Sequence, residues 1–406
     1  MEIVILANLS IATLRLDEWL TADDNHYDVV TTSKKRAEYA AANFAANVTL
    51  TYVDDWYAEA ALVGQIRRIN DHNRIQKIIS FRERDVLIAA RLRKLFKVPG
   101  QRIENAILYR DKVKMKSYLR EHGIPVTDFQ AIDDLLDALC FIEAHENQYP
   151  FVIKPVSGGG SADTSVVHNV AEVMAAVAHH SGEPQMIESF VDGKMYHIDV
   201  LRVDHQVRYI STGRYLTDCL AFQHGVSTAS AFLPYRTSES GRILAFANAT
   251  LDVMPVEKDA IFHIEVFENS AGQLVLCEIA CRAGGGRIVP LIEHNSHINL
   301  YKELLVHQIE RDELSDLREG QIHNDKYVGF VLTAPRQGTV VAAPKQVPFE
   351  YVDDYEIYTQ AGTVYGVPNS SVFATAFFDV HGSSVDEVSE KLAAVDNWMQ
   401  HNLAYQ

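Results

Sequence analysis

The 406-residue chain has few cysteines, fewer basic than acidic residues and no long apolar run. Its four cysteines are too few for a disulfide framework at this length, which favours a reducing compartment. Lys and Arg number 37 and Asp and Glu 54, so the formal charge is −17. This acidity argues against general binding to nucleic acid or to an anionic membrane. No stretch approaches the roughly 20 apolar residues of a membrane-spanning helix.

Several catalytic and targeting signatures are also absent. No Gly-Lys-Ser/Thr closes a P-loop, no G-x-G-x-x-G opens a helix, and no G-x-S-x-G elbow indicates a serine hydrolase. The 17 histidines show no zinc-like spacing with cysteines. Glu2 stands where a signal peptide would carry lysine or arginine. We therefore expect a soluble cytoplasmic protein.

Strand patterns and helix patterns alternate over the first third of the chain. We expect strands at Glu2–Ala7, Tyr27–Thr31, Val48–Val53 and Lys77–Ser80, and helices at Ser33–Asn47, Asp54–Asn70 and Arg84–Lys97. Such alternation predicts an open parallel α/β sheet of the Rossmann-like kind. The basic helix Arg84–Lys97 is interpreted as a solvated surface rather than a binding patch.

Antiparallel hairpins dominate from Asp111 onward. The patterns predict helices at Asp111–His122, Val170–His180, Ser296–Gln308 and Ser384–Asn402, strands at Phe151–Pro155, Thr164–His168 and Gln185–Val191, and hairpins over Met195–Tyr215 and Ala260–Arg282. This part is α+β, so the predicted fold class is an α/β region followed by an α+β region.

A glycine-rich turn follows directly on an apolar strand. Lys154 ends the strand, and the turn consists of Ser157, Gly158, Gly159, Gly160 and Ser161. Glycines let backbone N–H groups approach phosphate oxygens closely. A buried lysine needs an anionic partner, which a nucleotide phosphate can supply. From these residues alone two interpretations stay open: a phosphate-binding loop, or a flexible surface turn whose lysine reaches solvent.

Two acidic residues are expected to face each other across the second hairpin. Alternation puts His263 and Glu265 on one face of its first strand, and Glu278 and Arg282 on one face of its second. A loop centred at 271–272 sets Glu265 opposite Glu278, with Cβ atoms about 4.5–5.5 Å apart. A divalent cation such as Mg²⁺, shared with nucleotide phosphates, would compensate the two charges. The alternative is a solvent-facing hairpin whose acids point into water.

Three further features surround this hairpin. The same alternation puts Cys277 and Cys281 on the opposite face of the strand, as core thiols rather than metal ligands. Arg282 and the glycines 284–286 come where an anionic substrate or a developing phosphate charge would need donors. The polar segment 223–228, which contains His224, either lines the acceptor side of a site or is an ordinary loop.

Taken in order, these features resemble the ATP-grasp superfamily of carboxylate–amine ligases, over about residues 110–308. In that family a lysine after an aspartate opens the region, and a second lysine precedes the glycine-rich loop. An E-x-F-h-x-G stretch then holds adenine, two acids hold magnesium, and an arginine four residues after the second acid handles the reacting carboxylate and γ-phosphate. The matching residues here are Asp111-Lys112, Lys154, Glu188-Ser-Phe-Val-Asp-Gly193, Glu265 with Glu278, and Arg282.

The resemblance implies an ATP-grasp fold in three parts. A pre-ATP-grasp domain would span residues 1–110, a central subdomain with the glycine-rich lid 111–189, and a C-terminal subdomain with the metal-binding hairpin 190–406. The implied cofactors are ATP and Mg²⁺, which Mn²⁺ can replace. The implied roles are ATP binding for Lys112, Lys154, Ser157, Gly158, Gly159, Gly160, Ser161, Glu188, Ser189, Phe190, Val191 and His197, metal binding for Glu265 and Glu278, catalysis for Arg282, and substrate binding for His224, His263, Gly285 and Gly286.

Two positions depart from the family pattern. Met195 stands where a glutamate that binds ribose is usual. Either His197 or Asp199, on the following strand, takes that role, or ribose is held less tightly. Ala280 stands where an asparagine metal contact is usual, so one contact of the broader superfamily is missing.

The spacing Glu278-x-x-x-Arg282-x-Gly-Gly is more similar to the L-amino acid ligase, or dipeptide-synthesising, branch than to the biotin carboxylases. The resemblance therefore implies a ligase that activates an amino-acid carboxylate as an acyl phosphate and couples it to an amine, with release of ADP and phosphate. A carrier-bound acceptor and a non-catalytic nucleotide-binding module are the alternatives. The implied partners are small-molecule amino acids, and a homodimer is suggested by analogy alone. The overall acidity hints at a cationic substrate such as arginine or lysine, but a global charge does not put an acid in a pocket.

Overall fold

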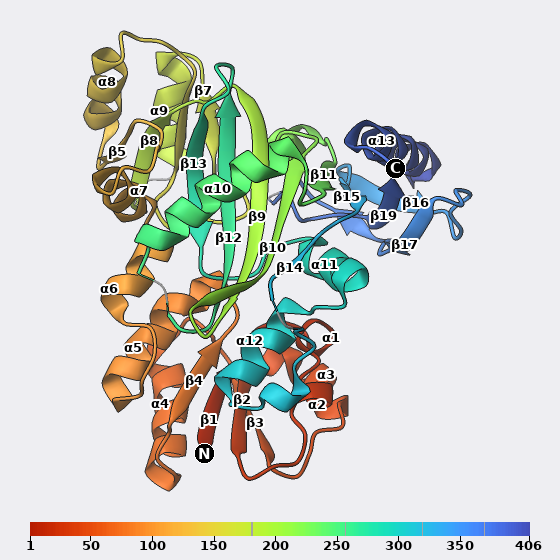
Figure 1. Cartoon of the computed structure of the whole chain (residues 1–406). Coiled ribbons are helices and arrows are strands. Elements are labelled where there is room, and N and C mark those ends of the chain that lie inside the picture. The colour runs from red at the N-terminus through yellow and green to blue at the C-terminus, as the bar shows by residue number, and fades with distance from the viewer. Residues whose placement is uncertain (180–181, 256, 319, 369) are drawn as a thin grey trace.

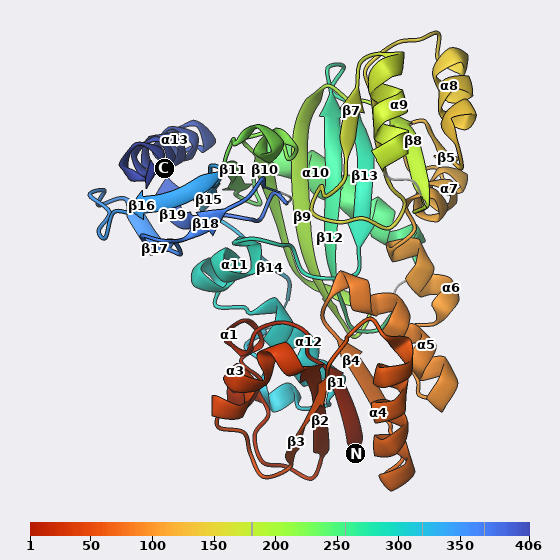
Figure 2. The ribbon, with the colours of Figure 1, turned by 180° about the vertical axis from the view of Figure 1, so that it is seen from behind.

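A parallel sheet opens the computed structural model, which describes residues 1–179, 182–255, 257–318, 320–368 and 370–406. Strands β1 (Glu2–Leu6), β2 (His26–Thr32), β3 (Val48–Val53) and β4 (Lys77–Ser80) lie in the order β3-β2-β1-β4. The helices here are α1 (Ile11–Leu14), α2 (Leu16–Trp19), α3 (Arg36–Ala41), α4 (Glu59–His72), α5 (Val86–Phe96) and α6 (Ile103–Ala106). Figures 1 and 2 show α4 and α5 on one side of the sheet and α1 to α3 on the other.

Alternate residues of β1 pack into two different cores. Ile3 and Ile5 join a cluster with residues of α1, α2 and α3, whereas Val4 and Leu6 join a cluster with α4 and α5. A strand buried on both faces is apolar throughout. This burial explains the apolar pattern of β1, and the structure confirms all four strands predicted for the parallel sheet.

The predicted helix Ser33–Asn47 is wrong in length. A 3-10 helix, Ser33–Lys35, leads into α3, after which the backbone is extended. The Asn47 side-chain amide donates to Asp23 Oδ1 at 3.0 Å and to the Asn25 carbonyl at 2.9 Å. Such side-chain bonds offer the chain an alternative to the helix, so the alanine content of the segment overstates its helical length.

An antiparallel sheet follows, with helices on one face. After α7 (Lys112–Glu121), strands β5 (Phe129–Ile132), β6 (Phe151–Pro155), β7 (Ser165–Val167) and β8 (Gln185–Ser189) lie in the order β5-β8-β6-β7. Helices α8 (Leu135–Ala144) and α9 (Val170–His179) cover one face through a cluster that includes Phe141 and Phe151. The last residue of the predicted helix Val170–His180 lies outside the described residues.

A large sheet occupies the centre of the molecule (Figure 1). Its strands run in the order β13-β12-β9-β10-β11-β15-β19-β17, and β14 pairs with β10. The bounds are β9 (Gly193–Val203), β10 (Gln206–Tyr215), β11 (Thr228–Leu233), β12 (Ala260–Asn269), β13 (Leu274–Ala280), β14 (Ile322–His323), β15 (Tyr327–Thr333), β17 (Val352–Ile357) and β19 (Ala376–Gly382). The pairs β9–β10 and β12–β13 confirm both predicted hairpins.

Helices cover two regions of this sheet. Helix α10 (Ser238–Val253) packs its apolar residues on β9, β10 and β12. Helix α13 (Val385–Asn402) packs on β11, β15 and β19. A small sheet in the order β18 (Val364–Tyr365), β16 (Gly338–Ala342) and β20 (Ala404–Tyr405) lies beside α13.

The predicted helix Ser296–Gln308 ends where predicted but begins four residues later, because a separate helix precedes it. Helix α11 (Ile288–Ser296) ends at His297, whose φ is 61°. Helix α12 (Leu300–Gln308) begins after Asn299, whose side chain accepts hydrogen bonds from two backbone N–H groups of its first turn. Asparagine is a strong N-cap, and it starts a new helix here. Among the described residues, every helix is too short or too polar to span a bilayer.

Candidate active site

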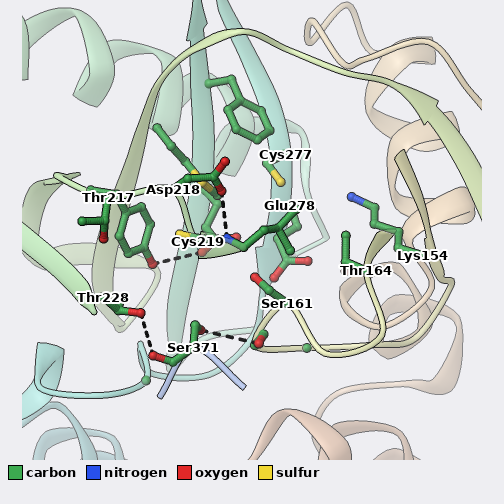
Figure 3. A pocket seen from close by; sticks show the side chains of 18 of the residues that line it. Lys154, Ser161, Thr164, Thr217, Asp218, Cys219, Thr228, Cys277, Glu278 and Ser371 are labelled. Atoms are coloured by element: carbon green, nitrogen blue, oxygen red, sulfur yellow. Dashed lines mark hydrogen bonds between the residues drawn. The ribbon is translucent and has the colours of Figure 1, made fainter. Parts of the chain in front are cut away.

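A cavity of about 630 Å³ opens between the β5–β8 sheet, the β12–β13 hairpin and the loop before β19. Figure 3 shows Lys154 and Glu278 facing it from different elements, with Ser161 and Ser371 close together on another side. Its wall includes the predicted residues Lys112, Lys154, Gly158, Gly159, Gly160, Ser161, Glu188, Ser189, Phe190, Val191, His263, Glu265, Glu278, Arg282, Gly285 and Gly286. Segments that are far apart in sequence therefore meet at one cavity.

Three predicted residues are not part of this wall. The Ser157 carbonyl accepts a hydrogen bond from Arg110 at 2.5 Å, at the base of the glycine-rich loop. His197 is fully buried behind the cavity. His224 is exposed at the end of the 3-10 helix Ala221–His224.

Glu188 lies buried between two lysines. One of its oxygens pairs with Lys154, and the other lies 3.0 Å from Lys116 Nζ and accepts from the Thr127 hydroxyl at 2.8 Å. Burial alone would raise the pKa of Glu188, but the two ammonium groups outweigh it and lower the pKa to about 2. Glu188 therefore supplies the anion that buried Lys154 requires. Lys116 could not be predicted, because α7 carries several lysines and no sequence feature marks the buried one.

Glu265 and Glu278 face each other directly across β12 and β13, as predicted. Near the turn, however, Val266 pairs with Leu276, one position away from the predicted register. Cys277 is the extra residue of a β-bulge that brings Glu265 back opposite Glu278. The prediction of the pair is confirmed, although the loop alone does not set the register.

The bulge also changes which side chains of β13 face the cavity. Cys277 and Glu278 both line it, whereas Leu276 packs into the core. The prediction that Cys277 points away from Glu278 is therefore wrong. Burial raises the pKa of the Cys277 thiol to about 12, which keeps it neutral. Cys281 packs against the core, as expected.

The two acids of the hairpin have different surroundings. Glu278 Oε2 lies 2.8 Å from Lys112 Nζ. Burial would raise the pKa of Glu278, but Lys112 outweighs it and lowers the pKa to about 2. Glu265 Oε1 accepts from the Tyr215 hydroxyl at 3.1 Å and lies 3.5 Å from His263 Nε2. Carboxylate oxygens opposed on one cavity wall are the ligands that Mg²⁺ takes in proteins, so this donor set fits the ion.

Arg282 is paired with Glu83, which belongs to a 3-10 helix that follows β4. Arg282 Nε donates to Glu83 Oε2 at 3.1 Å, and the same carboxylate pairs with Arg110. The three side chains join the parallel sheet to the hairpin and to the base of the glycine-rich loop. The sequence analysis missed Glu83. One signal was available, since ligands of open α/β sheets bind beyond the carboxyl ends of the strands.

A His–Asp–His network lies behind the cavity wall. Asp199 accepts from His197 Nδ1 at 2.7 Å and from His263 Nδ1 at 2.9 Å. Burial would lower the pKa of His263, but Asp199 outweighs it and raises the pKa to about 9. His263 alone of the three lines the cavity. The structure therefore does not bring His197 or Asp199 to the wall, where a ribose contact would be made.

The glycine-rich loop touches the C-terminal part of the chain. The Ser371 hydroxyl lies 3.5 Å from the Gly160 carbonyl, and the Thr228 hydroxyl donates to the Ser371 carbonyl at 2.8 Å (Figure 3). The Gln223 amide donates to the Thr164 carbonyl at 2.9 Å. The polar segment 223–228 thus meets the loop region through its two end residues and not through His224.

Comparisons with known proteins agree with this geometry. A family model described as an ATP-grasp domain matches residues 109–285. The chain is 26% identical over 329 residues to an L-arginine-specific L-amino acid ligase from Bacillus subtilis, a match that covers 78% of each chain.

Two solved structures illustrate the similarity in fold. An L-amino acid ligase from Bacillus licheniformis matches with a TM-score of 0.74 and 17% identity, over 100% of this chain and 98% of that one. A carboxyaminoimidazole ribonucleotide synthase from Aspergillus clavatus, complexed with ATP, matches with a TM-score of 0.70 and 12% identity, over 98% of each chain.

Proposed function

Because the chain has the ATP-grasp fold and contains an ATP-grasp domain, we propose that it is an ATP-dependent ligase that joins the carboxyl group of an amino acid to an amine. The amine is a second amino acid, and the by-products are ADP and phosphate. One observation carries the proposal. Glu265 and Glu278 are directly opposed on the wall that Arg282 also lines, in the same cavity as Lys112 and Lys154.

The nucleotide would lie along the wall formed by the lysines, the glycine-rich loop and the hinge 188–191. Lys112 bonds both Glu278 and the Gly158 carbonyl, each at 2.8 Å, so its charge lies between the hairpin and the loop. The Glu188 carboxylate is occupied by lysines, and we therefore assign the adenine contacts to the hinge backbone. Met195 lines the same cavity and provides an apolar surface there rather than a hydrogen bond to ribose.

The chemistry begins with a poor electrophile, the substrate carboxylate. One carboxylate oxygen attacks the γ-phosphorus of ATP, the bond to the β-phosphate oxygen breaks, and ADP and an acyl phosphate result. Glu265 and Glu278 would hold Mg²⁺, which neutralises charge on the β- and γ-phosphate oxygens when it is bound. Arg282 donates to the oxygens of the transferring phosphoryl group.

The second half-reaction forms the amide. The neutral amine of the acceptor attacks the acyl carbon, and the C–O bond to phosphate breaks. Phosphate leaves with the oxygen that came from the carboxylate, and the nitrogen loses a proton. Water would hydrolyse the acyl phosphate, so the cavity has to close. The contacts of Ser371 and Thr228 at the glycine-rich loop support a closing role for that loop.

The three-part division at residues 1–110, 111–189 and 190–406 belongs to this proposal, as does a homodimer. Light scattering on the purified chain measures the oligomeric state, and domain-wise proteolysis tests the boundaries.

Phosphate release tests the proposed activity. Mg·ATP is incubated with each of the twenty amino acids, singly and in pairs, with Glu278→Gln as the control, and products are identified by mass spectrometry. We expect release that depends on particular amino acids, an amide product, and loss of both in the variant. ATP binding without release for any pair would contradict the dipeptide reaction. It would favour a carrier-bound acceptor or a role in nucleotide binding alone.

A further inference from the structure

One end of the cavity is lined by apolar side chains. Gly285 and Gly286 follow Arg282 closely in the chain, and both line the cavity. A Cβ atom built on Gly286 would lie 3.0 Å from Leu332, 3.7 Å from Val372 and 3.9 Å from Phe330. A Cβ atom on Gly285 would lie 3.4 Å from Val372 Cγ1. These apolar side chains therefore lie within van der Waals reach of a Cβ at either glycine.

This end of the cavity combines a buried wall with an exposed one. Ile288, Phe330 and Leu332 line the cavity and also belong to the main core cluster, and they are almost completely buried. Val372 is different, because 49% of it is exposed. It lies next to Ser371, which contacts the glycine-rich loop. A ligand held against Val372 would thus be held by the segment that contacts the glycine-rich loop, which we propose closes the cavity.

In the described part of the chain, five acids line the cavity: Asp192 belongs to the hinge segment before β9, and the other four have polar partners. Glu188 and Glu278 are paired with lysines. Glu265 accepts from the Tyr215 hydroxyl, and Asp218 accepts from the backbone N–H of Leu220 at 2.8 Å. The three atoms nearest to a Cβ built on Gly286, and the atom nearest to one built on Gly285, are all side-chain carbons.

The neighbouring cation is neutralised as well. Arg287 follows Gly286 directly, but its guanidinium donates to Asp354 at 2.6 Å, pairs with Asp379, and lies 3.5 Å from the centre of the Phe377 ring. It is therefore committed to other partners. The described residues that line the subsite thus offer neither a carboxylate for a cationic substrate side chain nor a free guanidinium for an acidic one.

We infer that the amino acid whose carboxylate is activated carries an apolar side chain, of the leucine, methionine or phenylalanine kind, held by Ile288, Phe330, Leu332 and Val372. The inference rests on the proposed function. With the carboxylate directed at Arg282, the side chain of the substrate extends along Gly285 and Gly286 into this subsite. An arginine side chain would lose water there without gaining an ion pair. The inferred substrate therefore differs from L-arginine, for which the relative from Bacillus subtilis is named. It also differs from the cationic substrate at which the overall acidity hinted.

Competition between amino acids tests the inference. The wild-type chain is given Mg·ATP with one amino acid as carboxyl donor and an excess of alanine as acceptor, and amide products are measured by mass spectrometry. We expect leucine, methionine or phenylalanine to exceed arginine and lysine in kcat/KM by at least about 100-fold. A wild-type preference for arginine or lysine would overturn the inference and leave the ligase activity intact. If none of the amino acids gives an amide product, the proposed ligase function itself is contradicted.

A designed charge tests the position of the subsite. Val372→Glu adds a carboxylate on the exposed loop, and we expect the ratio of arginine to leucine turnover to rise at least about tenfold. Val364→Glu is the matched control, since Val364 is 73% exposed and is not part of the cavity wall. An unchanged ratio in Val372→Glu would overturn the assignment.

A second variant keeps the test independent of that loop. Gly285→Ala narrows the subsite at the same point, and we expect it to reduce turnover of phenylalanine more than that of alanine. Equal reduction of both substrates would contradict a side-chain subsite next to Gly285.

Discussion

Glu83 and Arg282 form an ion pair, 3.1 Å from Oε2 to Nε, that joins the parallel sheet to the acidic hairpin. The two residues lie 199 positions apart in the chain. Both side chains are largely buried, and Glu83 also pairs with Arg110, which bonds the base of the glycine-rich loop. One carboxylate therefore orients the guanidinium proposed to act on the phosphoryl group and anchors the loop proposed to close over it.

Glu83→Gln should lower kcat by about 10²-fold, because Arg282 loses its fixed partner and a misplacement of the order of 1 Å has that effect. The KM for ATP should rise as well, since Glu83 holds Arg110 at the base of the glycine-rich loop. Glu83→Asp keeps the charge and should recover part of the loss. Steady-state kinetics of the three proteins, with thermal midpoints as a check on folding, measure this. An equal kcat in Glu83→Gln and wild type would contradict the proposal that Glu83 orients Arg282.

Glu188→Gln should destabilise the protein by about 3–5 kcal/mol, because it leaves two buried ammonium groups facing a neutral amide. The effect depends on pH in a defined direction. The folded-state pKa of Glu188 is about 2, below the ordinary value of 4.5. The stabilisation is therefore complete above about pH 5 and declines as the pH falls through 4.5 towards 2, with about 1 kcal/mol lost at pH 4.

Urea unfolding of wild type and Glu188→Gln at pH 7, 5.5 and 4 measures this difference. The gap between the two proteins should be the same at pH 7 and 5.5 and smaller at pH 4. A gap that widens on acidification would mean that Glu188 is not the stabilised anion between Lys116 and Lys154.

Gly213→Ala should destabilise the protein by about 1–3 kcal/mol through overpacking. A Cβ atom at this position would lie 2.1 Å from His197 Nε2, so the ring has to move and Asp199 and His263 with it. We expect reduced turnover together with the loss of stability. Gly241→Ala, in α10 with no atom within 4 Å of the added Cβ, is the control and should be neutral or stabilising by up to about 1 kcal/mol. Similar thermal midpoints in both variants would contradict the tight fit.

Glu265→Gln and Glu278→Gln should each raise the Mg²⁺ concentration needed for half-maximal activity and lower kcat by at least about 10²-fold. Glu268→Gln is the matched control, because Glu268 lies on β12 but pairs with Arg242 outside the cavity. Magnesium titrations of turnover distinguish the three. A Glu278→Gln protein with wild-type magnesium dependence would rule out the metal assignment.

Local elements were largely predictable. Strands β3, β4 and β6 have the predicted bounds, because short runs of strand-forming residues that end at turns leave little choice. The comparisons confirm the resemblance to the ATP-grasp superfamily, which rested on residues in order along the chain. The helix ends were harder, because side-chain caps such as Asn299 override the apolar pattern.

The facing pair of acids shows how a correct prediction can rest on an incomplete reason. Glu265 meets Glu278 because a bulge at Cys277 offsets a turn that is one position away from the expected register. A bulge depends on packing against neighbouring strands, which period-two alternation does not contain. The same bulge is why the predicted orientation of Cys277 failed.

The long-range partners could not be predicted from local patterns. Glu83 pairs with Arg282 only because the parallel sheet docks beside the hairpin, and nothing within either segment specifies that docking. Phe330 and Leu332 reach the cavity from β15, and Val372 from the loop before β19, in a part of the chain where no site residue was predicted. Sites assembled from distant segments therefore need the fold before their walls can be named.

Transfer of a carboxylate oxygen to phosphate is the most direct test of the proposed ligase. An apolar amino acid labelled with ¹⁸O in its carboxylate is incubated with Mg·ATP, an acceptor amino acid and the wild-type chain, and the released phosphate is analysed by mass spectrometry. An acyl phosphate intermediate requires that phosphate carries one ¹⁸O atom and that the amide keeps the other. Unlabelled phosphate formed together with the amide would contradict carboxylate activation by phosphoryl transfer.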